Sequence, residues 1–87
     1  TNDIKFDIMR NMVKLEKLIA KILQNRTISY NEAERILKNL GFDVIACGSH
    51  HVFRKKGYSK NISIKKRPEL LPYQVREIKE VLRDHGY

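Results

Sequence analysis

Gly41 separates two parts of the chain that differ in the spacing of their apolar residues. The apolar residues that recur every three or four positions before it are Met12, Leu15, Ile19, Ile22, Ala33, Ile36, Leu37 and Leu40. Beyond Gly41, apolar and polar residues alternate. The first spacing is typical of amphipathic helices and the second of half-buried strands. The chain must therefore fold with helices followed by a sheet.

Local signals set the ends of the predicted helices. Ser29 followed by Glu32 is a capping box that begins the second helix. Gly41 suits the left-handed position that ends it, and Phe42 can fold back over the last turn. Pro72 suits the first turn of a third helix, which Gly86 ends. The apolar stripe of this last helix consists of Val75, Ile78, Val81 and Leu82.

Three short strands are predicted between the second and third helices, over residues 42–47, 50–55 and 61–66. Gly48 and Ser49 form the turn between the first two strands, and residues 56–60 form the next loop. Short links between consecutive strands indicate an antiparallel meander. The fold class is α+β: a three-stranded antiparallel sheet with helices on one face, plus an extra N-terminal helix. We expect residues 1–28 to be a leader and helix and residues 29–87 the main α-β-β-β-α domain, in one globular unit.

Composition favours a polyanionic partner. The formal net charge is +8, with 18 lysines and arginines against 10 acidic residues. Nucleic acid is the first candidate, an acidic protein the second and an anionic membrane surface a weak third. The chain shows no long apolar run and no signal-peptide pattern at its start. Cys47 is the only cysteine, so it has no internal disulfide partner, and we expect a cytoplasmic protein in which this strand-end thiol is buried as a small apolar residue.

Two consecutive histidines follow the Gly48–Ser49 turn, and their position on a strand decides which one faces solvent. If Phe53 anchors the core, His51 and Lys55 share its face. His50 then lies on the open face, and the polar residues expected to share that face are Arg54, Ser63 and Lys65. Histidine exchanges protons near neutral pH. We therefore select His50 as the candidate catalytic residue, with His51 in reserve because a one-residue slip in register would exchange them.

The other candidate site residues are predicted to contact RNA. They are Gly48, Ser49, Arg54, Lys55, Lys56, Lys65 and Lys66, and Lys60 and Arg67 extend the same basic cluster. Tyr30, Tyr58 and Tyr73 are further candidates for stacking on bases. The plainer interpretation is that both histidines are ordinary strand residues. A zinc site built from Cys47, His50, His51 and His85 lacks the usual ligand spacing, so we expect no metal and no other cofactor.

The motifs in residues 29–87 resemble the HicA toxins of bacterial toxin–antitoxin systems. They are Leu40-Gly41-Phe42, Gly48-Ser49-His50-His51-Val52-Phe53, a basic third strand and Leu71-Pro72-Tyr73-Gln74-Val75. The resemblance implies a fold like the double-stranded RNA-binding domain. It also implies a metal-independent mRNA interferase that uses a histidine of the Gly-Ser-His motif, in the bacterial cytoplasm. Its expected partners are mRNA and a HicB-type antitoxin that covers the active site.

The chain departs from this family pattern in two places. It has a long N-terminal segment, and its third strand ends Lys65-Lys66-Arg67 without a Pro-x-His sequence. Only the Gly-Ser-His-His segment is then left to supply imidazoles. Two other functions stay open: a non-catalytic module that binds double-stranded RNA, and a small DNA-binding protein that uses the last helix.

Overall fold

The computed structural model describes residues 15–87, and the order of its elements is the predicted one. A helix occupies residues 15–23, at the start of the described part of the chain. The elements that follow are α2 (Tyr30–Asn39), β1 (Asp43–Cys47), β2 (His50–Arg54), β3 (Ile62–Lys65) and α3 (Pro72–Asp84). The predicted strands differ from these bounds by one residue at some ends. The predicted leader, together with Met12 of the first apolar stripe, lies outside the described residues.

Both ends of α2 are fixed by the residues that the sequence singled out. The Ser29 hydroxyl accepts from the Glu32 amide at 3.2 Å, and the Glu32 carboxylate accepts from the Ser29 amide at 2.9 Å. At the other end Gly41 has φ +98°, which brings the Phe42 amide within 3.0 Å of the Leu37 carbonyl oxygen. This pairing is a Schellman motif. It turns the chain directly from α2 into β1.

The three strands form one antiparallel sheet in the order β1-β2-β3. Gly48 has φ +62° and Ser49 does not have a positive φ, which is the pattern of a two-residue type II′ hairpin turn. The turn fixes the register, so that Cys47 pairs with His50. On the other side of β2, His50 pairs with Lys65 and Phe53 pairs with Ile62.

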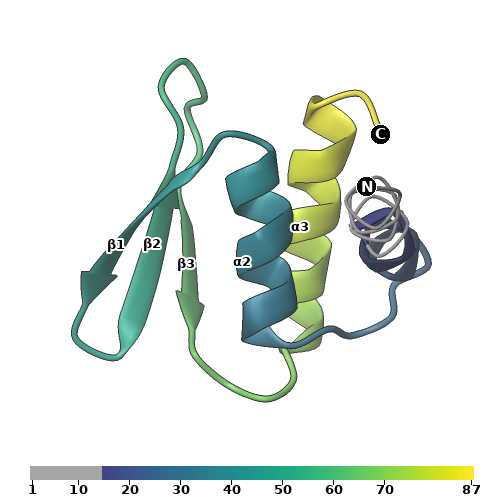
Figure 1. The fold of residues 1–87 in the computed structure, drawn as a ribbon, viewed down its shortest axis with the longest axis horizontal. Coiled ribbons are helices and arrows are strands. Elements are labelled where there is room, and N and C mark those ends of the chain that lie inside the picture. The colour runs from purple at the N-terminus through teal and green to yellow at the C-terminus, as the bar shows by residue number, and fades with distance from the viewer. Residues whose placement is uncertain (1–14) are drawn as a thin grey trace, which may run out of the picture.

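The core lies between the sheet and the two helices that cover one of its faces, α2 and α3 (Figure 1). The sheet contributes Phe53, Ile62 and Ile64, each at most 3% exposed. The helices contribute the predicted stripes, and the buried members are Ala33, Ile36, Leu37, Val75, Ile78, Val81 and Leu82. The alternate strand residues remain on the open face. The α+β class and the one-sided helix layer are therefore confirmed, and the α-β-β-β-α order is that of the double-stranded RNA-binding domain.

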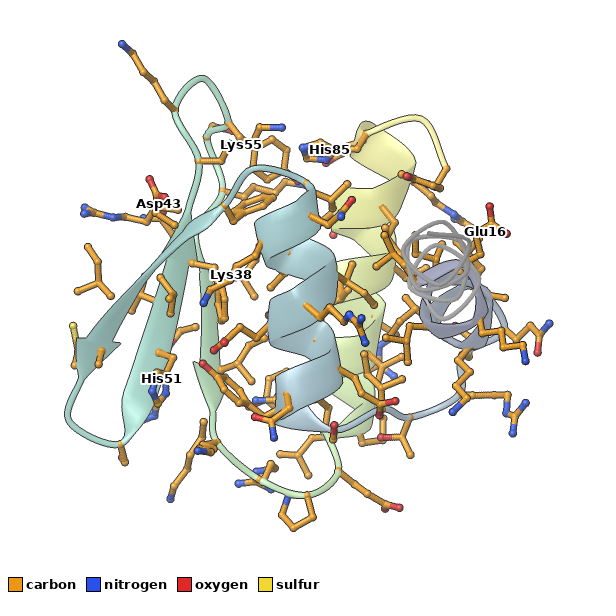
Figure 2. The ribbon with its side chains drawn as sticks, in the orientation of Figure 1. Glu16, Lys38, Asp43, His51, Lys55 and His85 are labelled. Carbon is orange, nitrogen blue, oxygen red and sulfur yellow. The ribbon has the colours of Figure 1, made fainter. Side chains whose placement is uncertain are left out.

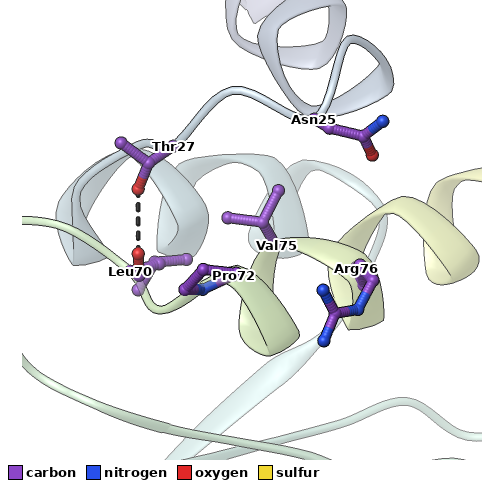
Figure 3. A pocket seen from close by; sticks show the side chains of 6 residues that line it. All are labelled: Asn25, Thr27, Leu70, Pro72, Val75 and Arg76. Carbon is purple, nitrogen blue, oxygen red and sulfur yellow. Dashed lines mark hydrogen bonds between the residues drawn. The ribbon is translucent and has the colours of Figure 1, made fainter.

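The helix at residues 15–23 lies beside α3, on the side away from the sheet (Figure 1). Its residues Leu18, Ile19 and Ile22 are buried in the same core cluster as α2 and α3. The connection that follows is held by the Thr27 hydroxyl, which donates to the Leu70 carbonyl oxygen at 2.9 Å (Figure 3). A cavity of about 290 Å³ lies at this junction, lined by Asn25, Thr27, Leu70, Pro72, Val75 and Arg76. None of the candidate site residues lines it.

The loop after β2 is fastened to the end of α3. The Tyr58 hydroxyl donates to the Asp84 carboxylate at 2.6 Å, and burial with this bond raises the pKa of Tyr58 to about 12. The Tyr58 ring also lies edge-on to Phe42, with ring centroids 5.6 Å apart. Within residues 15–87, no helix has the length and apolar character needed to cross a membrane.

Candidate active site

His50 lies on the open face of the sheet, at the end of β2 next to the hairpin turn. Its side chain is exposed, as are those of Ser63 and Lys65. Lys65 is its direct cross-strand partner in β3. Directly opposite residues in an antiparallel pair have Cβ atoms about 5 Å apart, so both side chains can reach one phosphate group. The face assignment predicted for His50 and Lys65 is confirmed.

Cys47 lies on the other side of His50 from Lys65, because it is the cross-strand partner of His50 in β1. Its side chain is exposed, so the prediction of a buried thiol is wrong. The reason is the hairpin register: the two residues that flank a two-residue turn share a face, and His50 is on the open one. The sequence held this information, since the turn length alone pairs Cys47 with His50.

His51 points to the opposite face and lies at the edge of the core. It is partly buried, and its ring centroid is 4.9 Å from that of Tyr30, the first residue of α2. Figure 2 places it near the turn end of the sheet. Its Nδ1 atom is buried and has no hydrogen-bond partner among the described residues. The two histidines therefore differ in environment: one is exposed beside a cation, and the other packs against an aromatic ring.

Tyr30 connects His51 to an acidic residue of α2. Its hydroxyl donates to the Glu34 carboxylate at 2.6 Å, and Lys38 pairs with the same carboxylate at 3.2 Å. The hydrogen bond from Tyr30 is the main cause that lowers the pKa of Glu34, and the positive charges of Lys38 and His51 act in the same direction against the effect of burial. Burial is the main cause that raises the pKa of Tyr30.

Arg54, Lys55 and Lys56 lie at the far end of the sheet from His50. Arg54 is four positions after His50 along β2, which is roughly 13 Å at the usual rise per residue. Lys55 is on the helix side, with its Nζ atom 5.9 Å from the centroid of the Phe42 ring. A depression of about 440 Å³ lies at this end, lined by Asp43, Arg54, Lys55, Lys56 and Asn61. The structure therefore brings Lys65 to His50 and places these three cations at a second basic region.

Three other predicted contacts with RNA are already engaged within the protein. Lys60 pairs with Glu80 at 2.6 Å and with Asp84 at 3.5 Å, so its charge is compensated. Tyr30 is only 3% exposed and Tyr58 is bonded to Asp84. Tyr73 is 50% exposed and is the one of the three tyrosines with an open ring. The partners of Lys60 and Tyr58 are Glu80 and Asp84 in α3, at least 20 residues away in sequence. Apolar alternation and composition do not predict such contacts.

The four residues of the candidate zinc site do not lie together. Cys47 and His50 share the open face, whereas His51 is on the other side of the sheet. His85 is at the opposite end of the molecule from His51 (Figure 2), and its ring lies 5.2 Å from that of Tyr58. Within residues 15–87, no group of three or more histidines, cysteines and acidic residues is arranged to hold a metal ion.

Comparison with known proteins adds a family assignment to this geometry. The family model described as "HicA toxin of bacterial toxin-antitoxin" matches residues 30–87, which run from the start of α2 to the end of the chain. The matched segment contains the whole sheet, with both histidines of β2, and α3, and the helix at residues 15–23 lies outside it. Comparisons with curated proteins and with solved structures give no match.

Proposed function

The chain belongs to the HicA toxin family of bacterial toxin–antitoxin systems, and on that premise we propose that it is an endoribonuclease that cleaves mRNA without a metal ion. The observation that carries the proposal is the position of His50. Its imidazole is exposed next to the hairpin turn, and His50 is directly opposite Lys65. A base beside a cation on an open face is what cleavage of a phosphodiester requires.

The reaction uses the RNA's own 2′-hydroxyl as the nucleophile. The His50 imidazole takes the proton from this hydroxyl, the 2′-oxygen bonds to the adjacent phosphorus, and the bond from phosphorus to the 5′-oxygen breaks. The 5′-oxygen takes a proton from water, and the resulting hydroxide takes the proton from the His50 imidazolium, which returns the histidine to its starting form. A positioned general acid or base typically contributes ~100- to 10,000-fold in rate. The products are a 2′,3′-cyclic phosphate and a 5′-hydroxyl end.

Lys65 stabilises the negative charge that gathers on the phosphate oxygens in the transition state. It suits this role because it pairs with His50 across the strands and has no ion-pair partner among the described residues. Cations aimed at developing charge are often the largest single contribution to such catalysis. Gly48 and Ser49 form the adjacent turn, where the space next to Gly48 is open to an RNA backbone. Arg54 and Lys56, at the other end of the sheet, contact more distant phosphates.

The antitoxin partner implied by the family binds the open face of the sheet in this proposal. Ile45 is 40% exposed there, and its cross-strand partner Val52 is partly buried. This apolar pair lies between two rows of cross-strand partners on the open face. One row is Cys47, His50 and Lys65, and the other is Asp43 and Arg54. A HicB-type protein with acidic residues around an apolar contact would complement the surface and hide His50 from RNA.

Cleavage of a defined mRNA by the purified protein, followed on a denaturing gel, tests the proposal. We expect cleavage in the presence of EDTA, products with cyclic phosphate ends, and no cleavage when a 2′-deoxynucleotide replaces the nucleotide at the cut site. Binding without cleavage would instead support the non-catalytic RNA-binding alternative. Stronger binding to duplex DNA than to RNA at equal salt would favour the DNA-binding alternative, although the helix at residues 15–23 already lies against one side of α3 (Figure 1).

A further inference from the structure

A cavity of about 290 Å³ lies between the start of α2 and the segment that leaves β3. It is lined by Ser29, Tyr30, Asn31, Lys66, Arg67 and Pro68. The Tyr30 amide donates to the Arg67 carbonyl oxygen at 3.2 Å, and this bond fixes the two walls relative to each other. The two segments that border the cavity are therefore held together by a backbone hydrogen bond.

Two buried side-chain nitrogens adjoin Tyr30 and have no partner among the described residues. One is Nε of Arg67, which lines the cavity, and the other is Nδ1 of His51, whose ring packs on Tyr30. The Tyr30 hydroxyl forms a hydrogen bond with neither nitrogen, because it donates to the Glu34 carboxylate. Buried polar atoms without partners are rare in folded proteins and often mark a place where a ligand, ion or water binds.

The two cations of the cavity are also uncompensated. Lys38 and Lys60 form ion pairs within residues 15–87, whereas neither Lys66 nor Arg67 pairs with another described residue. Arg67 presents a planar fork of donors, which matches the oxygens of a phosphate group better than a single ammonium does. An oxyanion is the ligand that compensates both charges together, and the terminal nitrogens of the Arg67 guanidinium are the donors it would meet, because Nε is itself buried.

Two residues of the cavity directly follow the proposed active site along the backbone. Lys65, the cross-strand partner of His50, is followed directly by Lys66 and Arg67. Two residues of extended chain span at most roughly 7 Å, which is comparable with one nucleotide step of an RNA strand. An RNA with its reacting phosphate at His50 and Lys65 can therefore present a neighbouring phosphate to the cavity.

We infer that the cavity between α2 and the β3–α3 segment is a phosphate subsite, in which Arg67 and Lys66 bind the phosphate next to the one that is cleaved. The inference rests on the proposed nuclease function and assigns a substrate-binding role to Arg67. Binding at this subsite holds the RNA strand across the end of the sheet and lowers KM. It leaves the chemical step at His50 largely unchanged, because the cavity does not contact the reacting atoms.

Short oligoribonucleotides that share one cut site test the subsite directly. Three versions carry an extra phosphate at the 3′ end, at the 5′ end or at neither. For the wild-type protein we expect one of the terminal phosphates to lower KM about tenfold with little change in kcat, which corresponds to one charge-assisted contact. The Arg67→Gln variant should lose this dependence on the phosphate, and Lys66→Gln should lose part of it.

Three controls make the outcome specific. Arg83→Gln removes an exposed arginine of α3 outside the cavity and should keep the full phosphate effect. Arg67→Lys keeps the charge without the planar fork and should keep part of it. Circular dichroism and thermal unfolding of each variant show whether it is folded, and the ratio of KM values with and without the phosphate is measured on folded protein.

Several results would overturn the subsite. One is an equal phosphate effect in the wild-type protein and Arg67→Gln, and another is no phosphate effect in the wild-type protein, each with RNA cleavage intact. A third is an Arg67→Gln variant that binds the antitoxin more weakly but keeps the phosphate effect, because the cavity would then take an acidic side chain of the partner. Failure of the wild-type protein to cleave any RNA would overturn the nuclease function itself, and the subsite with it.

Discussion

His50 and His51 are consecutive in β2, but one is exposed opposite Lys65 and the other packs on the ring of Tyr30 at 4.9 Å. Successive strand residues point to opposite faces of a sheet, and in the described part of the chain helices cover only one face of this sheet. The difference separates a residue that RNA can reach from one that helps to hold α2 on the sheet. It also makes the two histidines a matched pair for mutagenesis.

Replacing each histidine with alanine should have opposite consequences. His50→Ala should abolish cleavage, a loss of ~100- to 10,000-fold, and should change the free energy of unfolding by less than about 0.5 kcal/mol because the side chain is exposed. His51→Ala should lower that free energy by about 1 kcal/mol through loss of the ring contact with Tyr30. Urea unfolding and the gel assay measure the two effects. A folded His50→Ala protein with full activity, beside an inactive His51→Ala protein, would transfer the role to His51.

Modification of Cys47 should inhibit cleavage, because its exposed thiol is the cross-strand partner of His50. A bulky maleimide on this sulfur would occupy the space that the RNA needs. We expect at least roughly a tenfold loss of activity, as misplacement of a substrate by about 1 Å can cost a hundredfold. The Cys47→Ser variant should be active and insensitive to the reagent. Fully labelled protein that cleaves at the unlabelled rate would place the RNA away from this row of residues.

Removing the Tyr30 hydroxyl should make stability depend less on pH. The bond from Tyr30 lowers the pKa of Glu34 below its ordinary value of 4.5. A lowered pKa in the folded state adds stability that is fully present above the unfolded pKa and is lost as the pH falls through the folded pKa. Tyr30→Phe should therefore be less stable than the wild-type protein by about 1 kcal/mol at pH 7. The difference should shrink as the pH falls below 4.5.

Urea unfolding between pH 7 and pH 3 measures this difference. Tyr73→Phe is the matched control, because Tyr73 is 50% exposed and should unfold like the wild-type protein at every pH. A difference between Tyr30→Phe and the wild-type protein that stays constant down to pH 3 would show that packing of the ring, and not the bond to Glu34, explains the loss.

The helix at residues 15–23 should stabilise the family domain without contributing to catalysis. Ile22 is fully buried in the shared core, so Ile22→Ala should cost about 2–5 kcal/mol. Lys17→Ala, at an exposed position of the same helix, should stay within about 0.5 kcal/mol of the wild-type protein. Cleavage per folded molecule should be unchanged in both variants, since the helix lies on the side away from the sheet (Figure 1). Wild-type stability of Ile22→Ala would show that residues 29–87 fold without this contact.

The salt dependence of RNA binding should distinguish the free cations from the paired one. Each contact with a phosphate of single-stranded RNA contributes a slope of about −0.7 to the plot of log K against log salt concentration. Lys65→Ala should therefore reduce the slope by about 0.7. Lys60→Ala should leave it unchanged, because Lys60 is paired with Glu80 and Asp84. The measurement uses an RNA with 2′-O-methyl groups, which resists cleavage. Equal slopes for Lys65→Ala and the wild-type protein would show that Lys65 does not contact the RNA.

The sequence alone determined the elements of this protein and the face on which most residues lie. Ser29 with Glu32 and Gly41 with Phe42 fix the ends of α2 through bonds between residues at most five apart. Alternation around Phe53 assigned His50 to the open face. Such features depend on local hydrogen bonds and on the period of the backbone, and both are written in neighbouring residues. The family motifs likewise lie within the elements that these signals define.

Only the tertiary structure decided which of those residues meet. The contact of Tyr30 with His51, the pairing of Lys60 with Glu80 and the cavity that joins Tyr30 to Arg67 each connect elements that are far apart in sequence. Their formation depends on where α2 and α3 cross the sheet and on how the connecting segments return, which no local period encodes. For the same reason, the uncompensated charge of Arg67 became visible only when the surrounding side chains were in place.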